Sequence, residues 1–219
     1  MKHFINREML ALNVMTFPVD PAIGGEFADV GGSDDNFARI APGKKWSSDI
    51  QWISAANEAT FDRFQSAFDR LGIADHCAQY LDLERAVRLY AGFIIVRSRC
   101  TDAYFHVDWA RTNNQAFTFM TPITASSEDF GLLYKRLDDS IGQYDYQPGE
   151  GIAFGENFAH ATKPAQSDEP VSLLCFEYGT DKMEHWPNIL STVGDQVTHL
   201  KQPDGAFVRA PAISPARRY

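Results

Sequence analysis

The pattern of apolar and polar residues changes twice along the chain. Between residues 54 and 90, apolar side chains recur at three- and four-residue spacing, most clearly at Phe61, Phe64, Phe68 and Leu71. This spacing predicts an amphipathic helix that ends at Gly72, followed by a shorter helix over 74–81. Residues 1–50 are interrupted by prolines and paired glycines, so we expect them to be rich in loops.

From Leu89 onward the pattern becomes typical of β-strands. β-Branched and aromatic residues gather in short segments that polar turns separate. The expected strands are Leu89–Cys100, Ala116–Thr124, Gly131–Arg136, Ile152–Phe154 and Val171–Tyr178. Several short strands of this kind favour a closed or double-sheet β architecture. After Trp186 the pattern becomes irregular, and we expect the chain to end in a surface tail.

Composition narrows the class of protein. The chain has 219 residues, which suits a single domain over 1–219. Its 20 basic and 29 acidic residues give a net charge of −9, which argues against a nucleic acid partner. The longest apolar run, Leu89–Val96, has eight residues, whereas a membrane span needs about twenty. We therefore expect neither a nucleic acid nor a membrane as partner.

The cysteines and the first residues bear on the location of the protein. Cys77, Cys100 and Cys175 are odd in number and widely spaced, so they match neither a metal knuckle nor a disulfide framework. The N-terminal residues do not show the pattern of a signal peptide. A cytoplasmic setting with reduced thiols is the expectation.

The segment 104–109 carries the strongest chemical signal. If this segment is a strand, His106 and Asp108 point to the same side because they are two residues apart. His160 follows 54 residues after His106, behind a Pro-Gly turn and a short apolar strand. Two histidines and one carboxylate on a β scaffold can form the facial triad of a non-haem Fe(II) site. An isolated His-x-Asp also arises by chance, so the triad is a hypothesis.

The sequence over 89–180 resembles the Fe(II)- and 2-oxoglutarate-dependent dioxygenases. The resemblance rests on His106-x-Asp108, on the distal His160, and on the turn and strand over 148–154 that lead to it. It implies that His106, Asp108 and His160 bind Fe(II), and that 2-oxoglutarate is the co-substrate.

The resemblance also implies an organisation and a reaction. The fold would be mainly β, with a double-stranded β-helix (jelly-roll) catalytic core over 89–180 and N-terminal α-helices packed outside. Outside this core, the residue pattern described above predicts a loop-rich and helical support over 1–88 and a C-terminal extension over 181–219. Dioxygen would be consumed to hydroxylate or otherwise oxidise a small molecule. Related halogenases lack the carboxylate that Asp108 provides here, which favours oxidation. A homodimer is left open.

One position departs from the pattern of the family. Many members carry an arginine shortly after the distal histidine, and its guanidinium pairs with the far carboxylate of 2-oxoglutarate. A serine often follows two residues later. Here the tenth residue after His160 is Pro170, and Ser172 stands where the serine would be. Use of 2-oxoglutarate therefore requires another cation.

The first core strand offers that cation. In such a fold the first and last core strands are antiparallel neighbours, so the end of the first strand lies near Pro170. Arg97 is our first choice and Arg99 the second, with Lys135 as a weaker alternative; both arginines could instead face solvent. Thr118 could add a hydroxyl donor to the co-substrate.

Three residues beside the proposed ligands could border the substrate. They are Tyr104, Trp109 and Arg111, and a packing role is equally open for all three. Two rival functions also stay open. A metal-dependent β-barrel oxygenase or lyase that does not use 2-oxoglutarate would keep the triad and explain Pro170. A catalytically silent jelly-roll binding protein would make the triad an accident.

Overall fold

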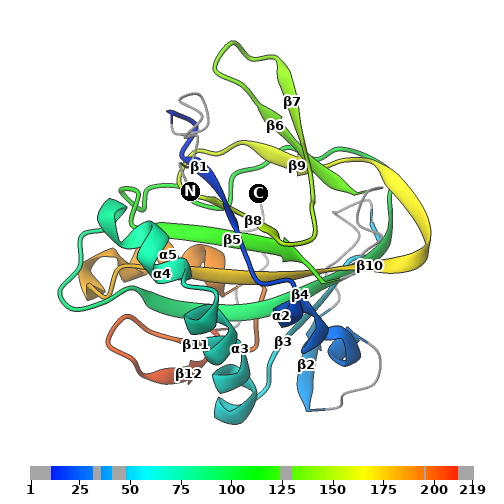
Figure 1. Ribbon diagram of the computed structural model, residues 1–219. Helices are drawn as coiled ribbons and strands as arrows, with labels where there is room; N and C mark the ends of the chain where they lie inside the picture. The colour runs from blue at the N-terminus through cyan, green and yellow to red at the C-terminus, as the bar shows by residue number, and fades with distance from the viewer. Residues whose placement is uncertain (1–10, 32–35, 41–47, 124–129, 195, 212–219) are drawn as a thin grey trace.

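The structure is a computed structural model of the chain (Figure 1). It describes residues 11–31, 36–40, 48–123, 130–194 and 196–211. These residues form mainly antiparallel β-sheets, with short helices between and around them. None of the helices in this part of the chain has the length and apolar character needed to cross a bilayer.

The larger sheet has seven strands, in the spatial order β1-β8-β5-β10-β4-β3-β2. Each strand pairs antiparallel with its neighbours. In chain order the strands are β1 (Val14–Pro18), β2 (Phe37–Ile40), β3 (Gln51–Ala55), β4 (Arg88–Cys100), β5 (Ala116–Pro122), β8 (Glu150–Phe154) and β10 (Ala165–Gly179).

A smaller sheet lies over one face of the larger one (Figure 1). Its three strands have the order β7-β6-β9, and they are β6 (Gly131–Lys135), β7 (Ile141–Asp145) and β9 (His160–Thr162). A separate hairpin joins β11 (His199–Lys201) to β12 (Phe207–Arg209). Two facing antiparallel sheets are the architecture of a jelly roll.

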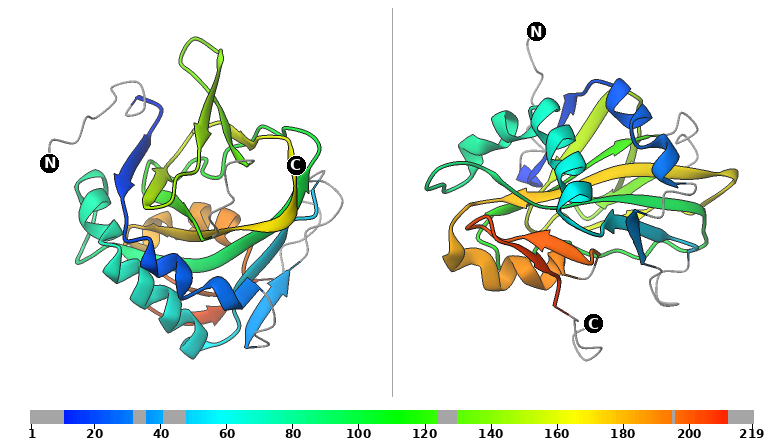
Figure 2. Two further views of the ribbon diagram at one scale, coloured as in Figure 1. Left: turned by 45° about the vertical axis from the view of Figure 1, so that its right-hand side comes forward. Right: turned by 90° about the horizontal axis from the view of Figure 1, so that it is seen from below.

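The α-helix over Glu58–Arg70, α3, packs against the other face of the larger sheet (Figure 2). The Asn57 side chain caps its first turn by accepting the Thr60 N–H. Its apolar stripe includes Phe64, which lies so close to β4 that a Cβ on Gly92 would be 2.4 Å from its side chain. The remaining short helices are α2 (Ala22–Gly25), η1 (Ala28–Gly31), α4 (Ile73–Cys77), η3 (Ala78–Tyr80), η5 (Met183–His185) and α5 (Trp186–Val193).

Side-chain alternation along the strands separates two apolar cores. On β10, Leu173 and Cys175 face the core between the two sheets, whereas Leu174 and Phe176 face the core under α3. Successive side chains of a strand point to opposite faces, so one strand can serve both cores. This explains why the segment predicted as Val171–Tyr178 is apolar without interruption.

Most of the predicted strands are confirmed within a few residues, and some predictions are wrong. The expected strand end at Thr124 lies outside the described residues. The segment after Trp186, expected to be irregular, instead contains α5 and the β11–β12 hairpin. Helix α5 buries Trp186, Ile189 and Val193, a three- and four-residue spacing that predicts a helix and was read as irregular. Residues 212–219 lie outside the described part of the chain.

Candidate metal centre

A loop and the first residue of β9 bring the three expected ligands together. His106 and His160 form an isolated antiparallel bridge in which each backbone N–H donates to the other's carbonyl at 2.9 Å. Directly paired residues present their side chains on the same face. The condition of a strand over 104–109 is not met, because His106 pairs only through this bridge and Asp108 lies in a bend. The bend nevertheless turns the carboxylate towards both rings.

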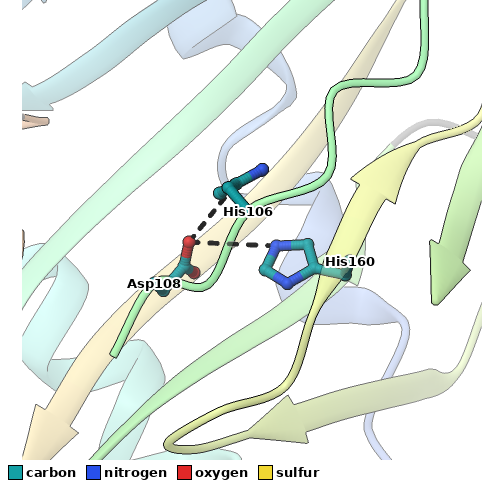
Figure 3. Close-up of side chains that lie close together, drawn as sticks. All are labelled: His106, Asp108 and His160. Carbon is teal, nitrogen blue, oxygen red and sulfur yellow. Dashed lines mark ion pairs between the residues drawn. The ribbon is translucent and has the colours of Figure 1, made fainter. Parts of the chain in front are cut away.

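The ligand atoms converge (Figure 3). The Nε2 atom of His106 is 3.4 Å from Asp108 Oδ1, and the Nε2 atom of His160 is 3.8 Å from the same oxygen. Two ligands held about 2.1 Å from one metal at right angles are about 3.0 Å apart. A small inward movement would therefore place all three around one octahedral ion.

The hydrogen bonds of the two rings select the tautomer that a metal needs. Nδ1 of His106 lies 3.0 Å from the carbonyl oxygen of Tyr104, and Nδ1 of His160 lies 3.0 Å from that of Phe158. A carbonyl oxygen only accepts, so each Nδ1 carries the hydrogen and donates it. The lone pair is then on Nε2, the atom that faces Asp108, as in many metal-binding histidines.

The charges of the ligands also suit a cation. Burial lowers the pKa of His160, so its ring is neutral at pH 7. Burial alone would raise the pKa of Asp108, but the neighbouring His160 and His106 and a Thr118 hydrogen bond lower it to about 2. A neutral imidazole and an ionised carboxylate are the forms that bind metal.

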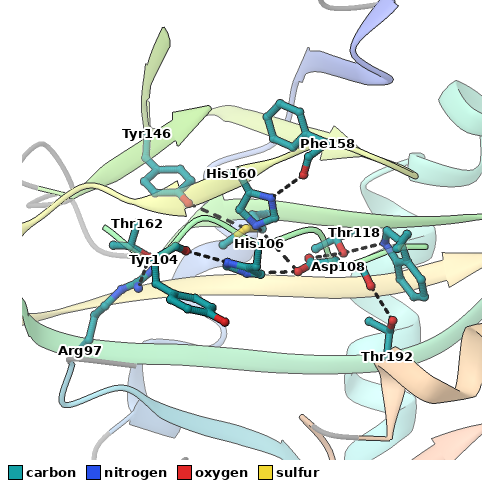
Figure 4. A network of polar contacts seen from close by, with 12 residues as sticks. Arg97, Tyr104, His106, Asp108, Thr118, Tyr146, Phe158, His160, Thr162 and Thr192 are labelled. Atoms are coloured by element: carbon teal, nitrogen blue, oxygen red, sulfur yellow. Dashed lines mark hydrogen bonds and ion pairs between the residues drawn. The ribbon is translucent and has the colours of Figure 1, made fainter. Parts of the chain in front are cut away.

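Asp108 is held from two directions (Figure 4). Its Oδ2 accepts a hydrogen bond of 3.0 Å from the Thr118 hydroxyl on β5. Its backbone carbonyl accepts from the Thr192 hydroxyl on α5. Trp109, the next residue along the chain, donates its indole N–H to Thr118 Oγ1 at 3.0 Å. Thr118 was expected to donate to a co-substrate, but its one hydrogen is directed to Asp108.

The three ligands lie in a pocket between the two sheets. Its walls are mainly apolar, and the apolar lining residues are Ile50, Trp52, Phe93, Ile95, Met120 and Leu132. The lining also includes Arg97 and Thr162. Such a cavity, with a few convergent polar groups, is typical of a small-molecule site.

Arg97 is a buried cation in this pocket, and its exposed fraction is 6%. It lies opposite Val171 in the pairing of β4 with β10, next to Pro170 as the strand order predicts. Its Nη1 donates to Thr162 Oγ1 at 2.6 Å. Its Nε is buried and has no hydrogen-bond partner within the described part of the chain.

The other expected co-substrate residues lie elsewhere. Arg99 is exposed and pairs with Gln166 outside the pocket lining. Lys135 is exposed, with its Nζ 5.9 Å from the centre of the Phe105 ring. Ser172 shares the strand face of Leu174 and Phe176, which is the face under α3. These placements differ from the expectation, and the side-chain alternation of β10 is the reason for Ser172.

Of the three expected substrate residues, Tyr104 lines the pocket. Its side chain is 41% exposed, and its ring is stacked on that of His106 with centroids 6.0 Å apart. Trp109 is fully buried in the core, so it cannot border a substrate. Arg111 is exposed outside the pocket lining, and its backbone N–H donates to Glu156. The structure thus places Trp109 in the core and Arg111 on the surface outside the pocket lining.

Sequence reasoning missed two residues that support the site. Thr162, which binds Arg97, is two residues after His160 on β9, so strand alternation could have placed it beside the ligand. Thr192, which binds the backbone of Asp108, lies in a segment read as irregular, and its sequence gives no comparable signal.

Comparison with known proteins gives a consistent result for the fold. No protein-family model matches the chain, and none of the curated proteins matches it. Among solved structures, the 2-oxoglutarate-dependent epimerase SnoN of nogalamycin biosynthesis has a TM-score of 0.60 at 11% identity, covering 80% of this chain and 81% of SnoN. HygX from Streptomyces hygroscopicus, with nickel and 2-oxoglutarate bound, has a TM-score of 0.57 at 13% identity, with coverages of 80% and 87%. A Pseudomonas putida prolyl-4-hydroxylase has a TM-score of 0.56 at 13% identity, with coverages of 80% and 96%.

These structures define the class of fold. The chain has the double-stranded β-helix fold of the non-haem Fe(II)- and 2-oxoglutarate-dependent oxygenases. The resemblance seen in the sequence is thereby confirmed at the level of the fold. Because unrelated functions share folds, the activity must be argued from the site.

Proposed function

We propose that this protein is a non-haem Fe(II)- and 2-oxoglutarate-dependent dioxygenase that hydroxylates a small molecule. The observation that carries the proposal is the convergence of His106, Asp108 and His160 in a largely apolar pocket, with both Nε2 lone pairs directed inwards. Two imidazoles and one carboxylate are the ligand set of this class of iron site. The shared fold supports the same assignment.

Arg97 is the proposed anchor for 2-oxoglutarate. A guanidinium buried in an apolar pocket carries a large desolvation cost unless an anion accompanies it. Thr162 accepts from Nη1. The edge formed by Nε and Nη2 is then left to donate one hydrogen bond to each oxygen of a carboxylate. The far carboxylate of 2-oxoglutarate has this shape and charge. Arg97 would thus replace the arginine that Pro170 removes.

The side chains of the pocket divide the remaining work. With iron bound, the site supplies the oxidation in which 2-oxoglutarate, dioxygen and a C–H bond give succinate, carbon dioxide and an alcohol. Ile95, Met120 and Leu132 exclude water from the ligands. Tyr104, exposed beside His106, lies where a substrate would enter.

Hydroxylation of a small molecule is the finer part of the proposal. It is supported by the carboxylate of Asp108, which completes the oxygenase ligand set, and by the position of the pocket between two sheets. Proteins of this fold differ in outcome, since SnoN is an epimerase and SnoK a carbocyclase. HygX has been observed with hygromycin B bound, a small molecule. A cytoplasmic location stays a prediction.

The test is anaerobic titration of the purified protein with Fe(II) and then 2-oxoglutarate. We expect one iron per chain and the weak visible charge-transfer band of the 2-oxoglutarate chelate. His160→Ala should lose most of the iron. His185→Ala is the matched control, because His185 belongs to a separate cluster with Asp82 and Glu184 at the protein surface.

Full iron stoichiometry in His160→Ala would show that the triad is not the metal site. Iron binding without the chelate band, and without succinate formation, would favour the rival metal-dependent oxygenase or lyase that does not use 2-oxoglutarate. An iron-free protein would favour a binding protein.

A further inference from the structure

We propose that Thr118, oriented by Trp109, is a positioning residue that presents Asp108 to the metal through a single oxygen. This inference rests on the proposed function. It concerns how many coordination positions of the metal ion are taken by protein atoms. Thr118 contacts Asp108 directly and Trp109 contacts Thr118, so the effect of both residues is exerted through Asp108.

The direction of both hydrogen bonds follows from the chemistry of the partners. An indole N–H can only donate, so Thr118 Oγ1 accepts from Trp109 at 3.0 Å. An ionised carboxylate can only accept, so the single hydrogen of Thr118 goes to Asp108 Oδ2, also at 3.0 Å.

The two oxygens of Asp108 therefore have different tasks. Oδ2 is held by Thr118, whereas Oδ1 is the oxygen near both histidines, 3.4 Å from His106 Nε2 and 3.8 Å from His160 Nε2. The bond to Thr118 takes up one lone pair of Oδ2 and holds the carboxylate with Oδ1 towards the two imidazoles. The hydrogen bond thus favours attachment through Oδ1 alone.

The surroundings make this arrangement rigid. Trp109 is fully buried and Thr118 is 3% exposed, so neither can turn freely. The Thr192 hydroxyl on α5 also holds the backbone carbonyl of Asp108. Side chains fixed by packing and by a second layer of hydrogen bonds are how proteins orient metal ligands.

The number of coordinating oxygens matters for this reaction. An octahedral ion bound by two histidines and one carboxylate oxygen has three positions left. A 2-oxoglutarate chelate uses two, and the third is needed for dioxygen. If Asp108 bound through both oxygens, one of these positions would be lost. Thr118 would thus preserve the room that the co-substrates need.

The experiment uses Co(II) as a stable probe, with dissociation constants measured by visible absorption for Co(II) and then for 2-oxoglutarate on the Co(II) protein. Thr118→Val keeps the shape of the side chain and removes the hydrogen. We expect it to weaken Co(II) binding, 2-oxoglutarate binding or both by about 10- to 100-fold. Thr118→Ser should restore both to near the wild-type values.

Thr121→Val is the matched control. Thr121 lies on the same strand, is similarly buried, and donates its hydroxyl to the Glu150 backbone carbonyl, away from the ligands. Its loss should lower the thermal stability of the metal-free protein without changing either dissociation constant. Trp109→Phe, which leaves the Thr118 hydroxyl unoriented, should lie between the wild type and Thr118→Val.

Two results would overturn the inference. One is a Thr118→Val protein with both dissociation constants unchanged, and the other is a Thr118→Ser protein as weak as Thr118→Val. The Ser and Trp109→Phe variants decide the matter even if Thr118→Val does not fold. The His160→Ala variant tests the proposed function separately. If it loses Co(II), the assignment of the metal site still stands. If it keeps Co(II), the proposed function itself is refuted.

Discussion

Removing the Arg97 guanidinium tests whether this residue replaces the missing arginine at position 170. We choose Arg97→Met, which keeps an apolar side chain in the pocket, and Arg97→Ala, which does not. Both remove the buried charge and the donors to a co-substrate carboxylate, and neither touches a metal ligand. The expected effect is weaker binding of 2-oxoglutarate at full iron content.

The magnitude follows from the bonds that the structure leaves available. Thr162 uses Nη1, and the buried Nε has no partner in the described residues, so a carboxylate can meet the Nε–Nη2 edge. Hydrogen bonds to charged groups contribute about 1.5–3 kcal/mol each, and neighbouring bonds do not add fully. A loss of about 1.5–4 kcal/mol corresponds to a rise of roughly ten- to a thousand-fold in the 2-oxoglutarate requirement.

The assay is succinate formation, or the anaerobic chelate band, as a function of 2-oxoglutarate concentration. Iron content is measured in the same samples. Arg99→Ala is the matched control, since Arg99 lies two residues further on β4 but is exposed outside the pocket lining. Arg97→Lys should be intermediate, because lysine keeps the charge and loses the two-point geometry.

An Arg97→Met protein that keeps its iron and reaches half-saturation at the wild-type 2-oxoglutarate concentration would refute this reasoning. The same result in Arg97→Ala would exclude compensation by the methionine side chain. The anchor would then be a cation outside the pocket lining described here, and Arg97 would serve only to hold Thr162.

Two further predictions concern stability. Gly92→Ala should lower the free energy of unfolding by about 1–3 kcal/mol, because the new Cβ would be 2.4 Å from Phe64, whereas Gly25→Ala, with open space around its Cβ, should change it little in the same urea titrations. Asp181→Ala should cost about 1–2 kcal/mol at pH 7, because the carboxylate accepts three backbone N–H bonds over residues 84–86. These bonds outweigh burial and lower the pKa of Asp181 in the folded protein, so its contribution is present above the unfolded value of about 3.9 and is lost as the pH falls through the folded value. The gap between wild type and variant should narrow in unfolding curves measured below about pH 4, and a gap that stays constant with pH would contradict the assignment.

The long central strands could be predicted from the sequence because both of their faces are apolar. Strands β4 and β10 are buried between two cores, so their sequences are continuous apolar runs. The short strands β7 and β9 could not be predicted in this way. Strand β7 lies at a sheet edge with mostly exposed residues, and β9 has three residues. Such segments become strands through their partners rather than through their own pattern.

The three side chains of the candidate metal centre could be predicted to lie together, but not the way they are brought together. The spacing of His106 and Asp108 indicated a shared strand face, whereas a single bridge to His160 and a bend place them. The backbone carbonyls that fix the two imidazole tautomers are invisible to side-chain patterns. Loop geometry of this kind depends on contacts between distant segments, which local sequence does not encode.

The location of Arg97 in the pocket could be predicted from strand topology rather than from a sequence motif. Proline at position 170 provides neither charge nor a backbone donor, so a carboxylate there would lack a partner. The antiparallel pairing of the first and last core strands then favoured the end of the first strand over Lys135, and Arg97 lies opposite Val171. Alternation along β4 puts Phe93, Ile95 and Arg97 into the pocket, and the strand end leaves Arg99 exposed. The strand topology pointed to the end of β4. It could not tell which of the two arginines lies in the pocket, because that depends on how far along β4 the pocket extends.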